Sequence, residues 1–328
     1  MDDSSVVCDL CHHACKIESQ SRGLCGVRIN QDGKLYSLAY GKASGLNLDP
    51  IEKKPLYHFL PKTKSLSLGA YGCNFSCLFC QNHELSQSAK LNPESLQSFD
   101  LPPEKIVEQA VKLKSPSISY TYSEPTVWSE YALDTIELAR KEKIKAVFVS
   151  NGFQSDQLTD ELIPVLDAIN IDLKSFSDDF YQKYAKARLE PVLENIKKFH
   201  DGGVHVEITT LVIPSLNDST DELKEIARFI ASIDKNIPWH ISRFFPQHKM
   251  TNFPPTPLDT LNAAYEVGKD AGLHFVYLGN VNDISRSSTY CPACGETLIR
   301  RDGYSIELLG LKNGKCSKCG TEIKVILK

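Results

Sequence analysis

No stretch of the 328 residues reaches the length of about 18 apolar residues that a membrane-spanning helix needs. The N-terminal residues MDDSSVVCDL lack the basic and apolar regions of a secretory signal peptide, so we expect a cytoplasmic protein. The formal net charge is only −4, so no basic field predicts binding to nucleic acid or to an anionic membrane. The chain also has no low-complexity tract, and its only repeat is an alternation of short apolar runs with amphipathic stretches.

Cysteine, in contrast, is abundant: eleven residues fall into packets of four, three and four. Disulfides would leave one cysteine over and are rare in a reducing cytosol, so the packets predict metal binding instead. The packets are Cys8, Cys11, Cys15 and Cys25; then Cys73, Cys77 and Cys80; then Cys291, Cys294, Cys316 and Cys319.

The central packet lies in LGAYGCNFSCLFCQN (68–82), where the spacing is C-x3-C-x2-C and Phe79 stands directly before the third cysteine. Three thiolates can bind three irons of a [4Fe–4S] cluster and leave the fourth iron open to a ligand that is not protein. Four thiolates would instead fit an electron carrier or a structural zinc. The alternative for this packet is a zinc site of three cysteines completed by a residue such as His83.

Residues 65–285 alternate strand-like runs with helical patterns, which predicts an α/β fold with a parallel sheet. This pattern fits either a partial or full (β/α) barrel or an open doubly wound sheet. Distinctive polar residues follow directly after the strands, as functional residues do at one face of a barrel, so we predict a barrel. The strand-like runs cover residues 65–70, 117–122, 145–150, 168–175, 205–213 and 239–245, with 274–279 as a possible seventh. The helical patterns cover residues 102–114, 124–143, 190–203, 219–234 and 257–272.

Residues 1–64 are predicted to form a small cysteine-rich module with the spacing C-x2-C-x3-C-x9-C. A hairpin is expected in VRINQDGKLYSLAYG, with its turn at Asp32-Gly33. Little apolar core is available here, so a metal would hold the module together. The four thiols can bind zinc or an iron–sulfur cluster, or remain free; His12 and His13 are expected beside the metal or in solvent rather than as ligands.

Residues 286–328 carry two C-x2-C-G knuckles, the pattern of a zinc ribbon. Gly after each pair lets the backbone turn under the metal. We expect Cys291, Cys294, Cys316 and Cys319 to bind a structural zinc ion, with an electron-relay cluster as the alternative.

The central motif, C-x3-C-x-aromatic-C in a loop after the first strand of a βα series, resembles the cluster motif of the radical S-adenosylmethionine (SAM) superfamily. The resemblance implies a partial (β/α)6 barrel in which SAM chelates the open iron through its amino and carboxylate groups. It also implies that an electron from the reduced cluster cleaves SAM, and that the resulting 5′-deoxyadenosyl radical abstracts a hydrogen atom. Cys73, Cys77 and Cys80 would then be catalytic as well as metal-binding.

Polar residues after later strands match further stretches of this superfamily. Glu124 in TYSEPT resembles the Glu of a Gly-Gly-Glu-Pro stretch that holds the SAM amino group, although Tyr and Ser replace the two glycines here. Asn151 in SNG resembles a turn near the SAM ribose or the substrate. Asp172 and Lys174 in DLK resemble a pair that reaches SAM in glycyl-radical activating enzymes. The alternatives are a carboxylate at a helix N-terminus for Glu124, a plain Asn-Gly turn for Asn151, and a structural ion pair for Asp172 and Lys174.

Two candidates come from the sixth strand, WHISRFF (239–245). Activating enzymes have a histidine near this place that faces the active site, which makes His240 the substrate-side candidate. Arg243 is expected to bind a carboxylate of SAM or of the substrate. The alternatives are a core histidine with its own hydrogen-bond partner, and a structural ion pair for Arg243.

The full-length layout, with CxLCxHxCxI, GCNFxCxFCQN, YTYSEPT, NIDLKSF, WHISRFFPQ and a terminal ribbon, resembles the AmmeMemoRadiSam radical SAM proteins. One position departs from that pattern, because His12 stands where the family often has Pro. The family is associated with Memo-type and AMMECR-type proteins, and its members are often labelled as homologues of pyruvate formate-lyase activating enzyme. Reduced ferredoxin or flavodoxin is the expected electron donor.

We therefore expect a radical SAM enzyme that abstracts hydrogen from a protein or peptide, either to activate a glycyl radical or to modify a side chain. The alternatives are a radical SAM enzyme acting on a small molecule and a non-catalytic adaptor that binds zinc. The expected parts are a module at 1–64, the barrel at 65–285 and the ribbon at 286–328.

Overall fold

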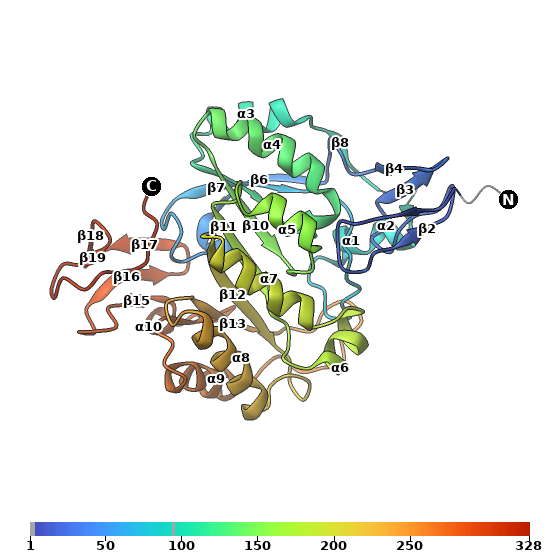
Figure 1. The fold of residues 1–328 in the computed structure, drawn as a ribbon. Helices are drawn as coiled ribbons and strands as arrows, with labels where there is room; N and C mark the ends of the chain where they lie inside the picture. The colour runs from blue at the N-terminus through green and yellow to red at the C-terminus, as the bar shows by residue number, and fades with distance from the viewer. Residues whose placement is uncertain (1–3, 94–95) are drawn as a thin grey trace.

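The computed structural model describes residues 4–93 and 96–328. Its centre is an eight-stranded sheet in the order β14-β13-β12-β11-β10-β9-β7-β6 (Figure 1). Neighbouring strands from β7 to β14 run parallel, and β6 pairs antiparallel with β7 at one edge. The strands are β6 (Gly45–Pro50), β7 (Lys64–Gly69), β9 (Ser117–Tyr120), β10 (Lys145–Ser150), β11 (Ala168–Asp172), β12 (His205–Val212), β13 (Trp239–Arg243) and β14 (Val276–Gly279).

The six predicted parallel strands are confirmed, and the possible seventh is β14. The sheet is extended at its other edge by β6, which comes from residues expected in the N-terminal module. Apolar side chains on both faces explain the parallel pairing; for example, the consecutive Ala146, Val147 and Phe148 of β10 are all buried.

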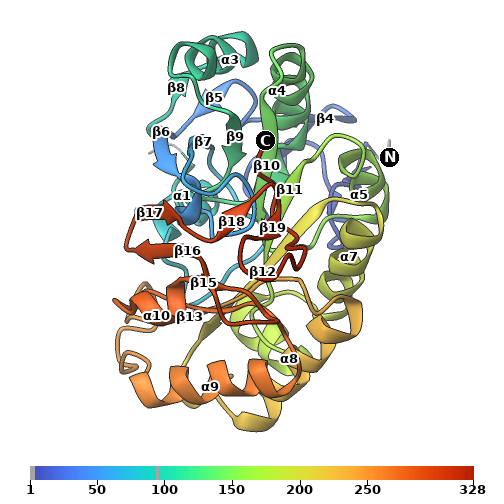
Figure 2. The ribbon, with the colours of Figure 1, turned by 90° about the vertical axis from the view of Figure 1, so that its left-hand side faces the viewer.

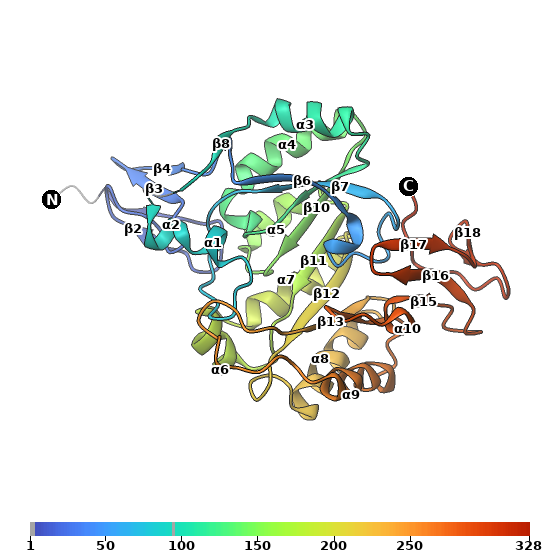
Figure 3. The ribbon, with the colours of Figure 1, turned by 180° about the vertical axis from the view of Figure 1, so that it is seen from behind.

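Helices cover the outer face of the sheet (Figures 1 and 3). They are α3 (Pro103–Lys112), α4 (Ser129–Lys141), α5 (Asp156–Leu162), α7 (Glu190–Asp201), α8 (Thr220–Ile233) and α9 (Leu258–Asp270). The short α5 was not predicted, although Ser155 caps it by accepting from Leu158 N at 3.3 Å. Its buried Leu158 and Leu162 are four residues apart, which is the signal that could have revealed it.

Short helices occur in the loops: η1 (Ile51–Lys53), α1 (His83–Ser86), α2 (Ser88–Leu91), η3 (Pro125–Trp128), α6 (Asp178–Phe180), the π-helical turn η4 (Tyr181–Ala185) and α10 (Ile284–Ser287). Within the described residues, no helix is long and apolar enough to cross a membrane.

The N-terminal residues form small two-stranded sheets beside the carboxyl ends of the barrel strands (Figure 1). The predicted hairpin is confirmed: β3 and β4 pair antiparallel around Asp32 and Gly33, whose φ values are 52° and 81°. The strands here are β1 (Val6–Val7), β2 (Lys16–Ile17), β3 (Arg28–Gln31), β4 (Lys34–Ser37), β5 (Lys42–Ala43) and β8 (Phe99–Asp100).

The C-terminal residues form the ribbon on the other side of the barrel, toward the starts of the strands (Figures 1 and 2). Its strands are β15 (Thr289–Tyr290), β16 (Thr297–Asp302), β17 (Ser305–Leu308), β18 (Leu311–Lys312) and β19 (Lys315–Cys316). Arg301, fully buried, donates from Nη2 to the Tyr57 carbonyl at 2.7 Å and so joins the ribbon to the barrel.

Candidate active site

The loop after β7 carries the three central cysteines at the carboxyl end of the barrel. Backbone hydrogen bonds hold this loop against η4: Ser76 N donates to Ala185 O at 2.8 Å and Leu78 N to Tyr184 O at 3.0 Å. Phe75 anchors the loop by packing edge-on against Phe153 and Tyr181. The loop therefore has a fixed shape that its own hydrogen bonds and an aromatic cluster maintain.

The three thiols fit an iron–sulfur cluster better than a single metal ion. Cys73 and Cys77 are buried and Cys80 is half-buried. Among the described residues, the group of ligand atoms that could hold a single metal ion is the ribbon's, and the three central thiols do not form one. Burial raises the pKa of Cys77 to about 12, so its thiolate needs a cationic partner. His83, the alternative fourth ligand of a zinc site, stacks on His248 instead.

A cavity of about 130 Å³ lies beside the cysteines and brings most of the predicted site residues together. Its wall includes Cys73, Cys77, Glu124, Asn151, Asp172 and Lys174, together with Phe75, Asn82, Ser86, Thr121, Tyr122, Ser123, Val149 and Ser150. These residues come from the ends of β7, β9, β10 and β11, so the carboxyl ends of four strands converge there.

Glu124 is a buried carboxylate with four hydrogen-bond donors. It accepts from Thr126 N at 3.1 Å, Thr126 Oγ1 at 2.6 Å, Ser150 Oγ at 2.8 Å and Asn151 N at 2.8 Å. Burial raises the pKa of Glu124, and these donors lower it in part. The carboxylate caps the N-terminus of η3 and also fixes the turn after β10. Glu124 is therefore both a carboxylate at a helix N-terminus, which was the alternative interpretation, and part of the cavity wall.

Asn151 connects Glu124 to the cysteine loop. Its Nδ2 donates to Asn74 Oδ1 at 2.7 Å and lies 3.8 Å from Cys73 Sγ. An amide N–H beside a cluster thiolate stabilises the negative charge of the sulfur. Asn151 therefore acts on the cysteine loop in addition to lining the cavity.

Asp172 and Lys174 form an ion pair across the end of β11, with Nζ and Oδ2 2.9 Å apart. Burial lowers the pKa of Lys174, but Asp172 and Cys77 raise it further, so the net shift is upward and the side chain is charged. A cation is thus held at the cavity wall, 5.8 Å from the Phe79 ring.

The structure does not bring His240 to this cavity. His240 is 4% exposed, lies near the start of β13, and donates from Nε2 to Glu207 Oε2 at 2.6 Å. Its ring also packs against Tyr57 and Tyr277. The substrate-side placement of His240 is therefore corrected to the core alternative, because a buried carboxylate and two aromatic rings occupy its surroundings.

Arg243 also lies outside the cavity wall. Its Nε donates to Thr256 O at 2.8 Å, and its guanidinium stacks over Phe245 at 5.0 Å. These contacts hold the loop after β13 rather than pointing the guanidinium toward the cysteines.

A larger cavity of about 520 Å³ adjoins the first and shares Asn82, Thr121, Tyr122, Val149, Asp172 and Lys174 with it. Its wall also contains Phe79 and Gln81 of the central motif and residues that the sequence analysis did not predict: Lys53, Lys54, Pro55, Thr209, Leu211, Ser242, Asn280 and Tyr304. Lys54 is 2% exposed, pairs with Asp49 at 2.8 Å, and lies 4.4 Å from the Tyr122 ring. The adjacent Lys53 and Lys54, four and five residues after Asp49, are the sequence signal that could have indicated this wall.

The four ribbon thiols form a preorganised metal site. Their ligand atoms all lie within 4.8 Å of one another. The Cys291–Cys319 and Cys294–Cys316 sulfur separations are 3.6 and 3.7 Å. A tetrahedral ion with metal–sulfur bonds of about 2.3 Å requires separations of about 3.8 Å, so one ion fits.

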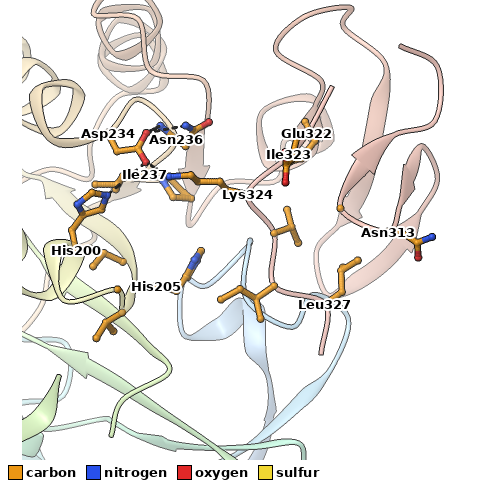
Figure 4. A pocket seen from close by; sticks show the side chains of 17 residues that line it. His200, His205, Asp234, Asn236, Ile237, Asn313, Glu322, Ile323, Lys324 and Leu327 are labelled. Atoms are coloured by element: carbon orange, nitrogen blue, oxygen red, sulfur yellow. Dashed lines mark hydrogen bonds and ion pairs between the residues drawn. The ribbon is translucent and has the colours of Figure 1, made fainter. Parts of the chain in front are cut away.

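Another cavity, of about 560 Å³, lies at the opposite end of the strands (Figure 4). It is bordered by the starts of β12 and β13 and by the C-terminal residues, and Lys324 pairs there with Asp234 at 2.6 Å. None of the three central cysteines lines it, so it does not belong to the candidate active site.

Residues 68–230 match the model of the radical SAM superfamily, and the chain belongs to this superfamily of enzymes. Over its whole length it is 42% identical to the uncharacterised protein MJ0808 of Methanocaldococcus jannaschii, of which 97% is covered. It is 25% identical to pyruvate formate-lyase 1-activating enzyme of Escherichia coli over 52% of this chain and 71% of that enzyme. A radical SAM methyltransferase from Sphaerobacter thermophilus has the same fold, with a TM-score of 0.53, 16% identity and coverage of 72% of this chain and 70% of that one. The superfamily implies a [4Fe–4S] cluster and SAM.

Proposed function

We propose that this chain binds a [4Fe–4S] cluster through Cys73, Cys77 and Cys80 and uses it with SAM to abstract hydrogen from a protein or peptide. The observation that carries the proposal is the shared cavity, in which two of these thiols meet Glu124, Asn151, Asp172 and Lys174. When bound, the cluster and SAM supply the adenosyl radical chemistry of the superfamily.

The chain's own residues would bind and orient the zwitterionic part of SAM. The Lys174 cation suits a carboxylate, and the Glu124 and Asp172 carboxylates suit an ammonium group. Asn151 fixes both the Glu124 carboxylate and the cysteine loop through its backbone and side-chain N–H groups. The cavity wall thus offers both signs of charge within one small volume.

A polypeptide substrate is supported by the larger cavity and by its access to the surface. Tyr304, 61% exposed at the turn between β16 and β17, lines this cavity together with Lys53 from η1. The wall therefore combines residues of the barrel, the N-terminal module and the ribbon. A segment of a polypeptide substrate could bind along such a wall. Memo-type or AMMECR-type proteins as partners, reduced ferredoxin or flavodoxin as donor, and zinc in the ribbon belong to the same proposal.

The decisive experiment is SAM cleavage by the anaerobically reconstituted chain with dithionite. We expect methionine and 5′-deoxyadenosine from the unmodified chain and none after combined Cys73→Ala, Cys77→Ala and Cys80→Ala substitution. The control is Cys319→Ser, at an exposed ribbon position, which should retain cleavage. A fully reconstituted, unmodified chain that forms no 5′-deoxyadenosine contradicts the proposal.

The substrate class needs a separate measurement. Cell extract is divided by dialysis, and each fraction is tested for stimulation of 5′-deoxyadenosine formation. Stimulation by the retained fraction that is lost after protease treatment supports a polypeptide substrate. Stimulation by the dialysable fraction alone contradicts it and favours a small molecule.

A matched pair of substitutions tests the cavity wall. Lys174→Met removes the cation on the wall and is expected to weaken SAM binding about tenfold or more, as loss of a charged hydrogen bond does. Arg243→Ala, outside the wall, should leave SAM binding within about twofold. Binding is measured from the change that SAM causes in the electron paramagnetic resonance (EPR) signal of the reduced cluster; equal effects of both substitutions would contradict the assignment.

A further inference from the structure

The four N-terminal cysteines surround a single cavity. Cys8, Cys11 and Cys25 are buried, Cys15 is half-buried, and all four line the same space. His13 lines it too, but its Nε2 contacts Asn74 O at 3.0 Å. Four thiols that face one another in a nearly solvent-free space indicate a ligand that binds sulfur.

Two buried N–H groups on this cavity have no hydrogen-bond partner. Arg28 is 5% exposed and Asn74 is 3% exposed, and both line the cavity. Within the described residues, Arg28 Nε and Asn74 Nδ2 lack acceptors. Burying such donors without partners costs about 1–3 kcal/mol each, so the cavity is expected to hold an acceptor for both. Cluster sulfides and cysteine thiolates are such acceptors.

Arg28 is held in place from its other side. Its two terminal nitrogens bind the Glu130 carboxylate at 2.8 and 2.6 Å, which leaves Nε as the unpartnered donor. The bidentate pair fixes the guanidinium plane at the cavity wall. The unpartnered donor is thus on a rigid group.

The spacing of the sulfur atoms distinguishes this packet from the ribbon. Among the described residues, the ribbon thiols form the only cysteine group with ligand atoms within 4.8 Å of one another. The N-terminal thiols line one cavity but do not form a group that could hold a single ion, as expected when each thiolate binds a different iron.

The N-terminal packet also lies directly against the loop of the central cysteines. A Cβ atom on Gly72 would come within 3.1 Å of the Cys25 carbonyl, so the two backbones are in close contact. Asn74 belongs to both surroundings: it follows Cys73, its side chain accepts from Asn151, and its carbonyl contacts His13 Nε2 at 3.0 Å. The packet also contacts the segment between β10 and α5, where Ser155 N donates to Leu10 O at 3.1 Å.

From these contacts we infer that Cys8, Cys11, Cys15 and Cys25 bind a second iron–sulfur cluster of the four-iron type, with Arg28 and Asn74 donating to its sulfur atoms. This site has no open iron, because each iron has a protein ligand. This inference rests on the proposed function in one respect, because the central cysteines are taken to bind the other cluster.

The test uses the full chain, reconstituted anaerobically with iron and sulfide, and measures iron and zinc. The unmodified chain is expected to hold about eight irons, and about four are expected after Ala substitution of all four N-terminal cysteines or of the three central ones. About four irons and about two zinc ions in the unmodified chain would overturn the inference, because the N-terminal packet would then be a zinc site.

EPR spectra of the reduced protein keep the inference testable if the N-terminal variant does not fold. The variant lacking Cys73, Cys77 and Cys80 retains the N-terminal packet, and its signal is expected not to respond to SAM, since no iron is open. No cluster signal in that folded variant, or a signal that SAM shifts, would overturn the inference. If the chain holds both clusters but cleaves no SAM, the proposed function is contradicted and this inference is not. If only the central packet holds iron, this inference is contradicted and the proposed function is not.

Discussion

The ribbon and the N-terminal module each contain four cysteines, but different parts of the structure position the two sets of thiols. In the ribbon, sulfur pairs lie 3.6 and 3.7 Å apart, and Gly295 and Gly320 shape the knuckles with φ values of 72° and 79°. In the N-terminal module the four thiols line a cavity that Asn74 and Val127 of the barrel help to close. The ribbon site is therefore built from local turns, whereas the N-terminal site depends on docking against the barrel.

The largest expected effect follows from removing one ligand of the zinc site that we propose for the ribbon. Cys316→Ala takes away one of four ligands, and structural metal sites of this kind contribute about 10 kcal/mol or more to the folding of their modules. We expect zinc to be lost and the ribbon to unfold, while the iron content stays unchanged. Metal analysis and proteolysis of residues 286–328 check this result. Loss of iron together with zinc would mean that the two ends of the molecule are not independent.

The ribbon's attachment to the barrel is tested next. Glu207 is fully buried and accepts from Tyr57 N at 2.9 Å and His58 N at 2.7 Å. The Tyr57 carbonyl in turn accepts from Arg301 of the ribbon. Glu207→Gln replaces a charged acceptor by one that cannot satisfy all its donors, at an expected cost of about 3–5 kcal/mol in the free energy of unfolding. Denaturant unfolding measures it, and a cost below about 1 kcal/mol would contradict this role.

The same carboxylate predicts a pH dependence. Burial would raise the pKa of Glu207, but hydrogen bonds from His205 and His240 lower it well below its usual value. A lowered folded-state pKa gives stability that is fully present above the unfolded value of about 4.3 and is lost as the pH falls below it. The unmodified chain should therefore begin to lose its stability advantage over Glu207→Gln below about pH 5 and continue to lose it as the pH falls toward the lowered folded-state pKa; an advantage that stays constant between about pH 5 and pH 3 would contradict the assignment.

The docking of the N-terminal module is tested by a smaller change. A Cβ at Gly72, where φ is 101°, would lie 2.7 Å from Val27, so Gly72→Ala should cost about 2–4 kcal/mol. Gly33→Ala is the matched control, because φ there is 81° but no atom lies within 4 Å; it should cost about 1 kcal/mol. Thermal unfolding and iron content measure both variants. Similar costs for the two would show that close contact between the backbones is unimportant.

The smallest expected effect concerns the ion pair behind the N-terminal cavity. Glu130 is 43% exposed at its side chain, so solvent screens its pair with Arg28. Glu130→Gln should lower stability by about 0.5–1 kcal/mol and leave the iron content unchanged. Loss of iron from this variant would show that Arg28 must be oriented for the N-terminal site to form.

Local patterns in the sequence predicted most of this architecture. Apolar runs marked the parallel strands, Asp32-Gly33 marked a hairpin turn, and the two knuckles marked the ribbon. The positions of Glu124 and Asp172 after strands were enough to place both beside the cysteines. These features depend on residues close in sequence, or on the rule that strand ends converge in a barrel.

Features that depend on distant segments were not predicted. His240 was predicted at the active site because activating enzymes have a histidine near this place on the sixth strand, but that resemblance does not reveal Glu207, which accepts a hydrogen bond from its ring. Lys54 and Tyr304 line the larger cavity through segments that the sequence assigned to the flanking modules. Register and tertiary packing decide such contacts, and neither can be seen in a local pattern.

The pairing of residues 58–60 with the C-terminal tail has a consequence for the order of folding. Ile326 N donates to His58 O at 2.8 Å, and Leu60 N donates to Ile326 O at 2.7 Å. During synthesis, residues 58–60 must wait until more than 260 further residues have left the ribosome before they gain these partners, since His58 and Lys324 are 266 positions apart. Contacts of such long range form late. We therefore expect the end of the barrel at which the strands begin to close last in the nascent protein, and its apolar surface to stay exposed to chaperones until then.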